Sequence, residues 1–477
     1  MKKIIVSLLL LVAMVVNIFA MTGCSLPFGG GGTNASASEA VAYDGSAVTI
    51  TFYHTMGANL RGVLDNAIVE FNKLYPNITI EHSQQGGYDD IVKMVSDDIA
   101  AGNQPNIAYC YADHVAAYNV SKAVLTLDNF IACQDVVERA DGTTEIVGLT
   151  EAQIADFIKA YYDEGAVFGD GLMYSLPLSK STEVLYYDKD FFEAEGLAVP
   201  TTWEEMENVC KTIKEKYPDS IPLGYDSEAN WFITLCEQYG AGYTSATGDH
   251  FLFDNDKCYE FVKMIRDWYQ KGYVTTEELY GGYTSGLFTK ADGTRSYMCI
   301  GSSAGATYQC PAKDDNGNYR FEVGITSIPQ VDAANNAKVI SQGPSLCIFK
   351  DSDPQQVAAS WLFVKYLTTN VNFQAEFSMV SGYVPVIKSV NENAAYAAWL
   401  AKADGNAYIQ ALSVKTCLAQ EKYYFTSPAF NGSSTARMQV GALLQACVVI
   451  KDEANLDALM KEAFANAIAE CEFSAGN

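Results

Sequence analysis

The sequence predicts an α/β fold built from two lobes. Early in the chain, β-rich runs alternate with segments whose apolar residues repeat at helical spacing. The chain has 477 residues, of which 49% are hydrophobic and 12% aromatic. About 430 of them follow a low-complexity N-terminal stretch, more than one compact hydrophobic core normally holds. Two α/β lobes are therefore expected.

A β-α-β unit is expected where the folded region begins. Residues 48–53 are rich in β-branched and aromatic side chains, which favour a strand. The next apolar residues share one face of a helix: Leu60, Val63, Leu64, Ala67, Ile68, Phe71 and Leu74. Residues 75–77 end that helix, and residues 78–80 begin a second strand. A further helix over 91–99 and a strand over 106–111 predict a parallel sheet.

Later segments carry their own start and turn signals. Residues 185–187 read as a strand, and Thr202 with Glu205 has the spacing of a capping box before another helix. Asp353 and Pro354 place a cap and a first-turn proline before a late amphipathic helix. Residues 313–318 have polar turn chemistry and predict a surface hairpin, because Tyr319 replaces the glycine that a calcium loop requires.

The first 24 residues predict export and lipid attachment. Two lysines precede an apolar run over residues 4–20, and Gly23-Cys24 completes a site similar to the bacterial lipobox. We expect a signal peptide over 1–23 and a lipid on Cys24, although an uncleaved membrane anchor is the alternative. Residues 24–46 are rich in Gly, Ser and Ala, so a flexible tether is expected there, with folded structure from Ala47.

The net charge indicates which partners this protein does not bind, and the cysteine count indicates the state of its thiols. The net charge of −26 becomes −28 when Lys2 and Lys3 leave with the signal, and such a surface repels nucleic acid and anionic headgroups. Eleven cysteines remain besides Cys24, an odd number without paired spacing. We expect them to be mostly buried small apolar residues, with at least one thiol outside any disulfide.

The catalytic patterns are weak. Residues 301–305 match the Gly-x-Ser-x-Gly nucleophile elbow, but all four histidines precede Ser303, so the hydrolase order of Ser, acid and His is impossible. A ligand contact or a plain turn remains open for this segment. The histidines lack zinc spacing, and no nucleotide-binding glycine loop is present. We expect no enzyme activity, metal or cofactor, with a secreted hydrolase as the disfavoured alternative.

Several motifs together resemble the family 1 extracellular solute-binding proteins of ABC importers. They are residues 71–76 (Phe-Asn-Lys-Leu-Tyr-Pro), 101–105 (Ala-Gly-Asn-Gln-Pro), 176–190, 200–205 (Pro-Thr-Thr-Trp-Glu-Glu) and 381–386. The resemblance implies a two-lobe periplasmic-binding-protein-like fold with hinge-linked lobes and a ligand cleft. It places the N-terminal lobe at 47–175 with 330–384 and the C-terminal lobe at 176–329 with 385–477. Chain crossings would lie near 174–177, 329–343 and 384–387.

Within that family, the glycerol-3-phosphate-binding members are the most similar. The resemblance assigns ligand contacts to six residues: Tyr88, Ser181, Ser302, Gly343, Tyr383 and Arg437. An arginine fork would hold the phosphate, while hydroxyls and a close backbone amide fill the rest. The family glutamate falls on Ala112, with Asp113 as a substitute, and Trp231 or Phe232 lies near one of two tryptophan contacts.

The resemblance also implies the biological role. It predicts a membrane-anchored receptor outside the cytoplasm that captures glycerol-3-phosphate or a related phosphorylated polyol or glycerophosphodiester for ABC permease subunits. A monomer is expected. An oligosaccharide receptor is the alternative within the family, and an adhesion or signalling module of the same fold is another.

Overall fold

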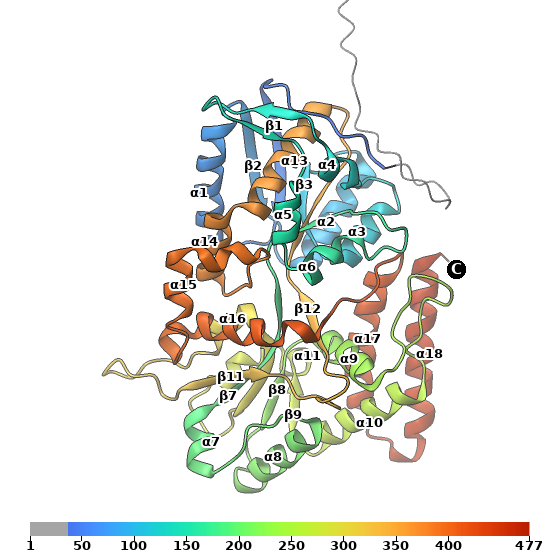
Figure 1. Ribbon diagram of the computed structural model, residues 1–477. Helices are drawn as coiled ribbons and strands as arrows, with labels where there is room; N and C mark the ends of the chain where they lie inside the picture. Colours follow the sequence, from blue (N-terminus) through green and yellow to red (C-terminus); the bar gives the residue numbers. More distant parts are fainter. Residues whose placement is uncertain (1–36, 477) are drawn as a thin grey trace, which may run out of the picture.

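The computed structural model describes residues 37–476 as two α/β lobes, one above the other in Figure 1. The N-terminal lobe contains a five-stranded sheet in the order β2-β1-β3-β13-β6, and the C-terminal lobe a sheet in the order β14-β12-β7-β10-β8-β9, with β11 paired to β7. The predicted fold class of two hinge-linked α/β lobes is confirmed.

The N-terminal sheet is built from the expected β-α-β units. Strands β1 (Val48–His54), β2 (Ile78–Gln84) and β3 (Ile107–Cys110) are parallel, while β13 (Ser345–Ile348) and β6 (Leu176–Pro177) add antiparallel pairs. The helices of this lobe are α1 (Ala58–Leu74), α2 (Tyr88–Ala101), α3 (Ala112–Asn119), α4 (Asp128–Ala132), α5 (Glu151–Asp156), α6 (Lys159–Asp163), α13 (Pro354–Thr369) and α14 (Val371–Ser381). A small hairpin joins β4 (Val136–Glu138) to β5 (Thr144–Ile146). The predicted helix and strand positions over residues 48–111 are confirmed.

The C-terminal sheet surrounds the long strand β7 (Ser181–Asp188). Its other strands are β8 (Leu223–Tyr225), β9 (Val274–Thr276), β10 (Met298–Ser302), β11 (Val323–Ser327), β12 (Val339–Gln342) and β14 (Tyr424–Phe425). The helices are α7 (Lys189–Glu195), α8 (Trp203–Lys216), α9 (Glu228–Tyr239), α10 (Asp256–Gln270), α11 (Glu277–Tyr280), α12 (Ser285–Phe288), α15 (Ala394–Leu400), α16 (Ile409–Gln420), α17 (Ser433–Val448) and α18 (Leu456–Ala475). The predicted capping box of Thr202 and Glu205 begins α8, and Asp353 caps α13 as expected.

The chain passes between the lobes three times. It crosses from β6 to β7, returns from β12 to β13, and leaves the first lobe again after α14, where Val384 pairs with Lys180. Two expected boundaries shift: the one expected at 175/176 lies after Pro177, and the one expected at 329/330 lies after Gln342. Leu176–Pro177 pairs with β13 in the N-terminal lobe, and Val339–Gln342 pairs with β7 in the C-terminal lobe, because backbone pairing continues across the crossings.

The expected start of folded structure at Ala47 is too late. Ala40 and Tyr43 are buried, and Ser38 exchanges hydrogen bonds with the backbone and hydroxyl of Thr126. The amide of Asp44 also donates to the side chain of Gln355, at 2.8 Å. The end of the expected tether, residues 37–46, therefore packs on the N-terminal lobe. The signal peptide and Cys24 lie outside the described residues.

Two further expectations concern membranes and thiols. Within residues 37–476, no helix has the length and apolar character needed to cross a membrane. Cys133 aside, the cysteines of this region form no disulfide within it, and all are buried except Cys310, which is half-buried. Burial of this kind fits the expectation that they serve as small apolar side chains.

Candidate functional site

The candidate site is a cleft between the two lobes, with about 530 Å³ of empty space of which part is open solvent. The N-terminal lobe contributes the residues that begin α3 and Glu164, while the C-terminal lobe contributes side chains from β12, from the segment after β14, and from α17. The lining residues are Tyr111, Ala112, Asp113, Glu164, Ile233, Tyr243, Thr244, Ile340, Ser341, Gln342, Thr426, Ser427, Pro428, Ser433 and Arg437. The polar groups of the lining are hydroxyls, an amide and the charged groups of Asp113, Glu164 and Arg437.

Arg437 is the cation of this cleft. It lies in the first turns of α17 and donates from Nη2 to the Oδ1 atom of Asn230 on α9. Asn230 in turn donates from Nδ2 to Oε1 of Gln342 on the crossing strand β12, at 2.8 Å. Because Asn230 is neutral, this hydrogen bond does not neutralise the guanidinium, and Arg437 can pair with an anion in the cleft. The sequence-predicted position of Arg437 in the cleft agrees with the structure.

A buried carboxyl lies behind Arg437. Glu183 on β7 accepts a hydrogen bond at 2.7 Å from the Tyr225 hydroxyl. Burial raises the pKa of Glu183 to about 8 and outweighs the opposing effects of Tyr225, Asn230 and Arg437. At neutral pH the carboxyl is therefore mostly protonated, and it does not neutralise the arginine.

Tyr111 lines the N-terminal side of the cleft, and other tyrosines lie close to it. The ring of Tyr88, at the start of α2, stacks on Tyr111 with centroids 4.2 Å apart. Burial raises the pKa of Tyr88 well above its usual value, and the phenols of Tyr111 and Tyr383 raise it further. The hydroxyl of Tyr109 is buried without a hydrogen-bond partner among residues 37–476. These phenols stay protonated, and Tyr109 is a donor in need of a partner.

Ser181 and Gly343 lie where the chain crosses between the lobes. Ser181 is buried and pairs with Gln342 across β7 and β12. Gly343 has φ of +102°, and a Cβ there would lie 2.5 Å from the backbone oxygen of Ser179. Only glycine fits this conformation and this close approach. The expected backbone role of Gly343 remains a prediction, while its need to be glycine follows from the packing.

The Gly-x-Ser-x-Gly segment is a strand end followed by a 3-10 turn. Ser303 is completely buried, and its Oγ accepts a hydrogen bond at 3.1 Å from the amide of Thr182. Ser302 is exposed, and its Oγ accepts from the amide of Ala304 at 3.3 Å. The buried Ser303 hydroxyl is a structural acceptor, which is inconsistent with an exposed nucleophile. Ser302 is the serine that remains accessible.

Of the expected ligand contacts, Asp113 and Arg437 line the cleft, and Trp231 lies farthest from this role. Its side chain is completely buried in the hydrophobic core of the C-terminal lobe. The ring stacks on Tyr225, with centroids 4.4 Å apart, and also packs against Trp203 and Trp268. The expectation of a ligand contact is wrong for this conformation, because the side chain has no accessible surface. Phe232 is likewise fully buried.

Asp113 lines the cleft as expected, with a side chain only 16% exposed. Its Oδ1 accepts a hydrogen bond at 3.1 Å from the amide of His114, near the first turn of α3. The neighbouring imidazole is buried, and this burial lowers the pKa of His114 despite the nearby Asp113 carboxylate. Asp113 is thus an ionisable acceptor in the cleft beside a neutral histidine.

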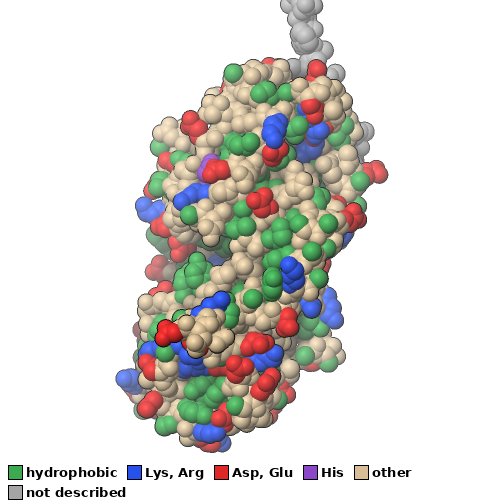
Figure 2. Space-filling view, turned by 90° about the vertical axis from the view of Figure 1, so that its left-hand side faces the viewer, with side chains coloured by type: hydrophobic (Ala, Val, Ile, Leu, Met, Phe, Trp, Pro, Cys, Tyr) green, Lys and Arg blue, Asp and Glu red, His purple; other side chains and the backbone are tan. Residues whose placement is uncertain are grey.

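Most polar residues that line the cleft were not identified from the sequence, among them Glu164, Tyr243, Gln342 and Thr426. None belongs to a recognisable motif, because each reaches the cleft through contacts with distant parts of the chain. No group of three or more His, Cys, Asp or Glu residues within 37–476 could hold a metal ion. Figure 2 shows acidic and basic side chains interspersed over both lobes on one face of the molecule.

A cleft between two hinge-linked α/β lobes, with polar and charged side chains in its lining, is the arrangement expected of a solute-binding protein. A family model described as bacterial extracellular solute-binding protein matches residues 66–403. The chain belongs to this family of ABC importer receptors, which bind and deliver solutes outside the cytoplasm and are not enzymes.

Individual relatives support the same assignment. The chain is 26% identical over 351 residues to the sn-glycerol-3-phosphate-binding periplasmic proteins UgpB of Shigella flexneri serotype 5b and Escherichia coli K12, covering 72% of this chain and 75% of each relative.

Solved structures share the fold. UgpB from Mycobacterium tuberculosis, in complex with glycerophosphocholine, has a TM-score of 0.69 and 16% identity, covering 90% of this chain and 98% of that one. The GacH receptor of Streptomyces glaucescens, solved unliganded and with acarbose, has a TM-score of 0.67, 16% identity and the same coverage. The cyclic α-maltosyl-1,6-maltose binding protein of Arthrobacter globiformis has a TM-score of 0.66 and 18% identity, covering 90% and 99%.

Proposed function

We propose that this receptor captures glycerol-3-phosphate or a related phosphorylated polyol or glycerophosphodiester. The observation that carries the proposal is the position of Arg437, whose guanidinium faces a neutral partner and lines the cleft. A phosphate with two oxygens toward the guanidinium would form charge-assisted hydrogen bonds, each worth about 1.5–3 kcal/mol. The binding specificity of the UgpB relatives supports the same ligand class.

Binding between the lobes would favour the closed arrangement. The ligand would contact Arg437 and Ser302 from the C-terminal lobe and Tyr88 and Tyr383 from the N-terminal side. Because such contacts form on both sides only when the lobes approach, ligand shifts the population toward closure. The closed receptor would then dock on the permease and release the intact solute.

A thermal-shift panel tests the ligand class. Glycerol-3-phosphate, glycerophosphocholine, inorganic phosphate, maltose and maltotriose are added to the mature protein and its Arg437→Ala variant. Phosphorylated ligands should stabilise the parent, and the variant should lose that stabilisation. Arg320→Ala is the matched control, since Arg320 is an exposed arginine that donates to the carbonyl of Thr289. Stabilisation by neutral sugars alone would contradict the phosphate proposal.

An oligosaccharide receptor is the second candidate. Neutral acceptors and donors of the cleft favour it, namely the hydroxyls of Thr244, Ser341, Thr426 and Ser427 and the amide of Gln342. Several neighbours in the same fold family bind maltose-type sugars. The same thermal-shift panel separates the two, because a sugar receptor should retain its stabilisation by maltotriose when Arg437 is replaced.

We also propose that a lipid on Cys24 holds the receptor at the cell membrane. Confinement would raise the effective concentration of the receptor at its permease. Expression of Cys24→Ala in a bacterial host should release the protein from the membrane fraction, and mass spectrometry of the parent should find the lipid on the N-terminal cysteine. Membrane retention of the variant would contradict a single lipid anchor.

A further inference from the structure

Glu164 is a buried carboxylate at the cleft with one oxygen already bound. The residue is only 5% exposed, yet it lines the cleft between the lobes. Its Oε1 atom accepts from the ammonium of Lys180 at 2.7 Å. Its Oε2 atom lies 3.5 Å from the hydroxyl of Thr426, which is too long for a strong hydrogen bond. One oxygen is thus held while the other retains acceptor capacity.

Lys180 holds this carboxylate in place from the hinge. Its side chain is completely buried, and the ammonium donates to Glu164, to the backbone oxygen of Gly343 at 3.2 Å and to Oγ of Ser345 at 3.2 Å. Three donors therefore have three partners. The backbone of Lys180 also exchanges hydrogen bonds with Val384, so the lysine connects all three crossing segments.

The buried ion pair of Lys180 and Glu164 is not explained by its contribution to stability alone. Removing both charges from water costs several kcal/mol, and the Coulomb attraction of such a pair often only offsets that cost. An ionised carboxylate has about four acceptor positions. The contacts of Glu164 described above leave positions on Oε2 open at the cleft, where hydroxyl groups of a ligand can donate to it.

We propose that Glu164 is the hydroxyl-binding residue of this receptor, so that the ligand combines an anion at Arg437 with hydroxyl groups at Glu164. Lys180 acts as a positioning residue that fixes the carboxylate and links it to the hinge. The part of this proposal that places an anion at Arg437 rests on the proposed function, whereas the part that places hydroxyl groups at Glu164 does not. The ligand class is then a polyhydroxylated phosphate, and inorganic phosphate should bind without using Glu164.

Isothermal titration calorimetry of the mature protein tests whether Glu164 binds the hydroxyl groups and not the phosphate. The probes are glycerol-3-phosphate, inorganic phosphate and maltotriose, each titrated into the parent and into Glu164→Gln. The variant should bind glycerol-3-phosphate about 10- to 100-fold more weakly, the range expected for a lost hydrogen bond to a charged acceptor. Its affinity for inorganic phosphate should stay within about twofold of the parent.

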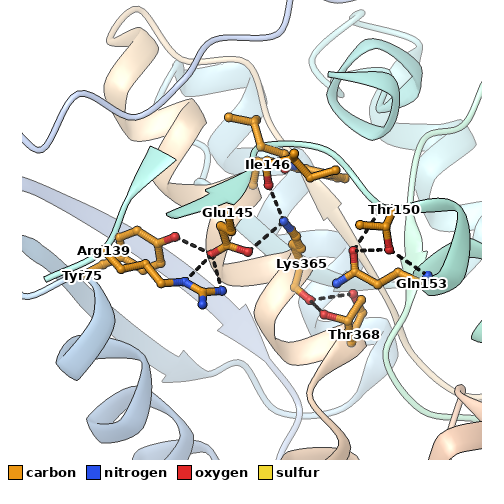
Figure 3. Close-up of polar contacts among 11 residues, drawn as sticks. Tyr75, Arg139, Glu145, Ile146, Thr150, Gln153, Lys365 and Thr368 are labelled. Carbon is orange, nitrogen blue, oxygen red and sulfur yellow. Dashed lines mark hydrogen bonds and ion pairs between the residues drawn. The ribbon is translucent and has the colours of Figure 1, made fainter. Parts of the chain in front are cut away.

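The chain offers a matched control in the Glu145 and Lys365 pair. Figure 3 shows this second buried lysine bound to a carboxylate, in the N-terminal lobe and with the nitrogen and oxygen 2.9 Å apart. Glu145→Gln should leave the affinities for all three probes unchanged. The double variant Glu164→Gln/Lys180→Met removes both charges of this ion pair, so it repeats the affinity test if the single variant fails to fold.

The outcomes distinguish this proposal from the proposed function. Equal weakening of phosphate and glycerol-3-phosphate, or no weakening of either, would overturn the role of Glu164. Binding of maltotriose alone, weakened in Glu164→Gln, would overturn the phosphate function while retaining the hydroxyl role. A parent protein that binds none of the probes would overturn both.

Discussion

Two buried lysines of this receptor are paired with carboxylates in different surroundings. In the pair of Lys365 and Glu145, both carboxylate oxygens are occupied, because Oε2 accepts from Lys365 while Oε1 accepts from Tyr75 and, at 3.1 Å, from Nε of Arg139 (Figure 3). In the pair of Lys180 and Glu164, one oxygen has only the long contact with Thr426. The first pair is a closed structural cluster, and the second leaves an acceptor at the cleft.

The direction of the Glu145 pKa shift agrees with a structural role for this cluster. Burial acts to raise the pKa of Glu145, but donation from Tyr75 and the charges of Lys365 and Arg139 outweigh it, so the pKa is lowered. The ionised form is thus the one that the fold stabilises. A carboxylate with both oxygens bonded serves the fold, whereas one with an oxygen only weakly bonded at a cleft has acceptor capacity for a ligand.

The largest expected effect is on stability, from Glu145→Leu. This change leaves the ammonium of Lys365, with a side chain 4% exposed, without its carboxylate partner. Loss of one partner of a buried pair typically costs about 3–5 kcal/mol of unfolding free energy. Urea unfolding should show that loss, and the double variant Glu145→Leu/Lys365→Met should recover much of it. Unchanged ligand affinity in the folded variant would support a purely structural role.

Glu183 is a buried carboxyl without a lysine partner among residues 37–476, and its effect on stability should depend on pH. Its pKa of about 8 exceeds the unfolded value of 4.5, so the folded state binds the proton more tightly. Its contribution to stability is therefore fully present below pH 4.5 and is lost as pH rises through 8. The groups around it are Tyr225 on β8, Asp226 beyond that strand, Asn230 on α9 and Arg437 on α17.

Glu183→Gln imitates the protonated carboxyl and should remove this pH dependence. Between pH 4.5 and 6.5 the unfolded carboxyl loses its proton while the folded one keeps it, and each pH unit corresponds to about 1.4 kcal/mol, so the variant should be more stable than the parent by roughly 2–3 kcal/mol at pH 6.5. Near pH 4.5 the two proteins should have similar stability. Urea unfolding at both pH values measures the difference, and parallel stability curves for parent and variant would show that Glu183 does not titrate in this range.

Local sequence signals predicted much of the fold. The β-α-β unit over residues 48–111 and the capping box of Thr202 and Glu205 depend on neighbouring residues, and the structure contains them. Residues 37–46 were expected to be a tether because their composition is weakly apolar. They pack through Thr126 and Gln355, which are distant in sequence, so composition alone did not reveal the contact.

The residues of the candidate site were harder to predict than the helices and strands, because they also depend on contacts between distant parts of the chain. Arg437 and Asp113 line the cleft where the family resemblance placed them. Trp231 fits a ligand contact by residue type, but it is on the core face of α9. Glu164 gave no sequence signal, since its partner Lys180 lies 16 positions away and Thr426 lies 262 positions away. Contacts across the crossings arise only from the tertiary fold.

The smallest expected effect comes from removing the second donor to each carboxylate. Tyr75→Phe deletes a hydroxyl that donates to Glu145, and a hydrogen bond to a charged group is worth about 1.5–3 kcal/mol. Thr426→Val deletes the hydroxyl near Glu164 while keeping a similar shape, and the 3.5 Å contact should contribute under about 0.5 kcal/mol. Urea unfolding of both variants without ligand compares the two values directly. A loss in Thr426→Val as large as in Tyr75→Phe would mean that Glu164 is already fully bonded, which would remove the acceptor that distinguishes the cleft pair from the structural one.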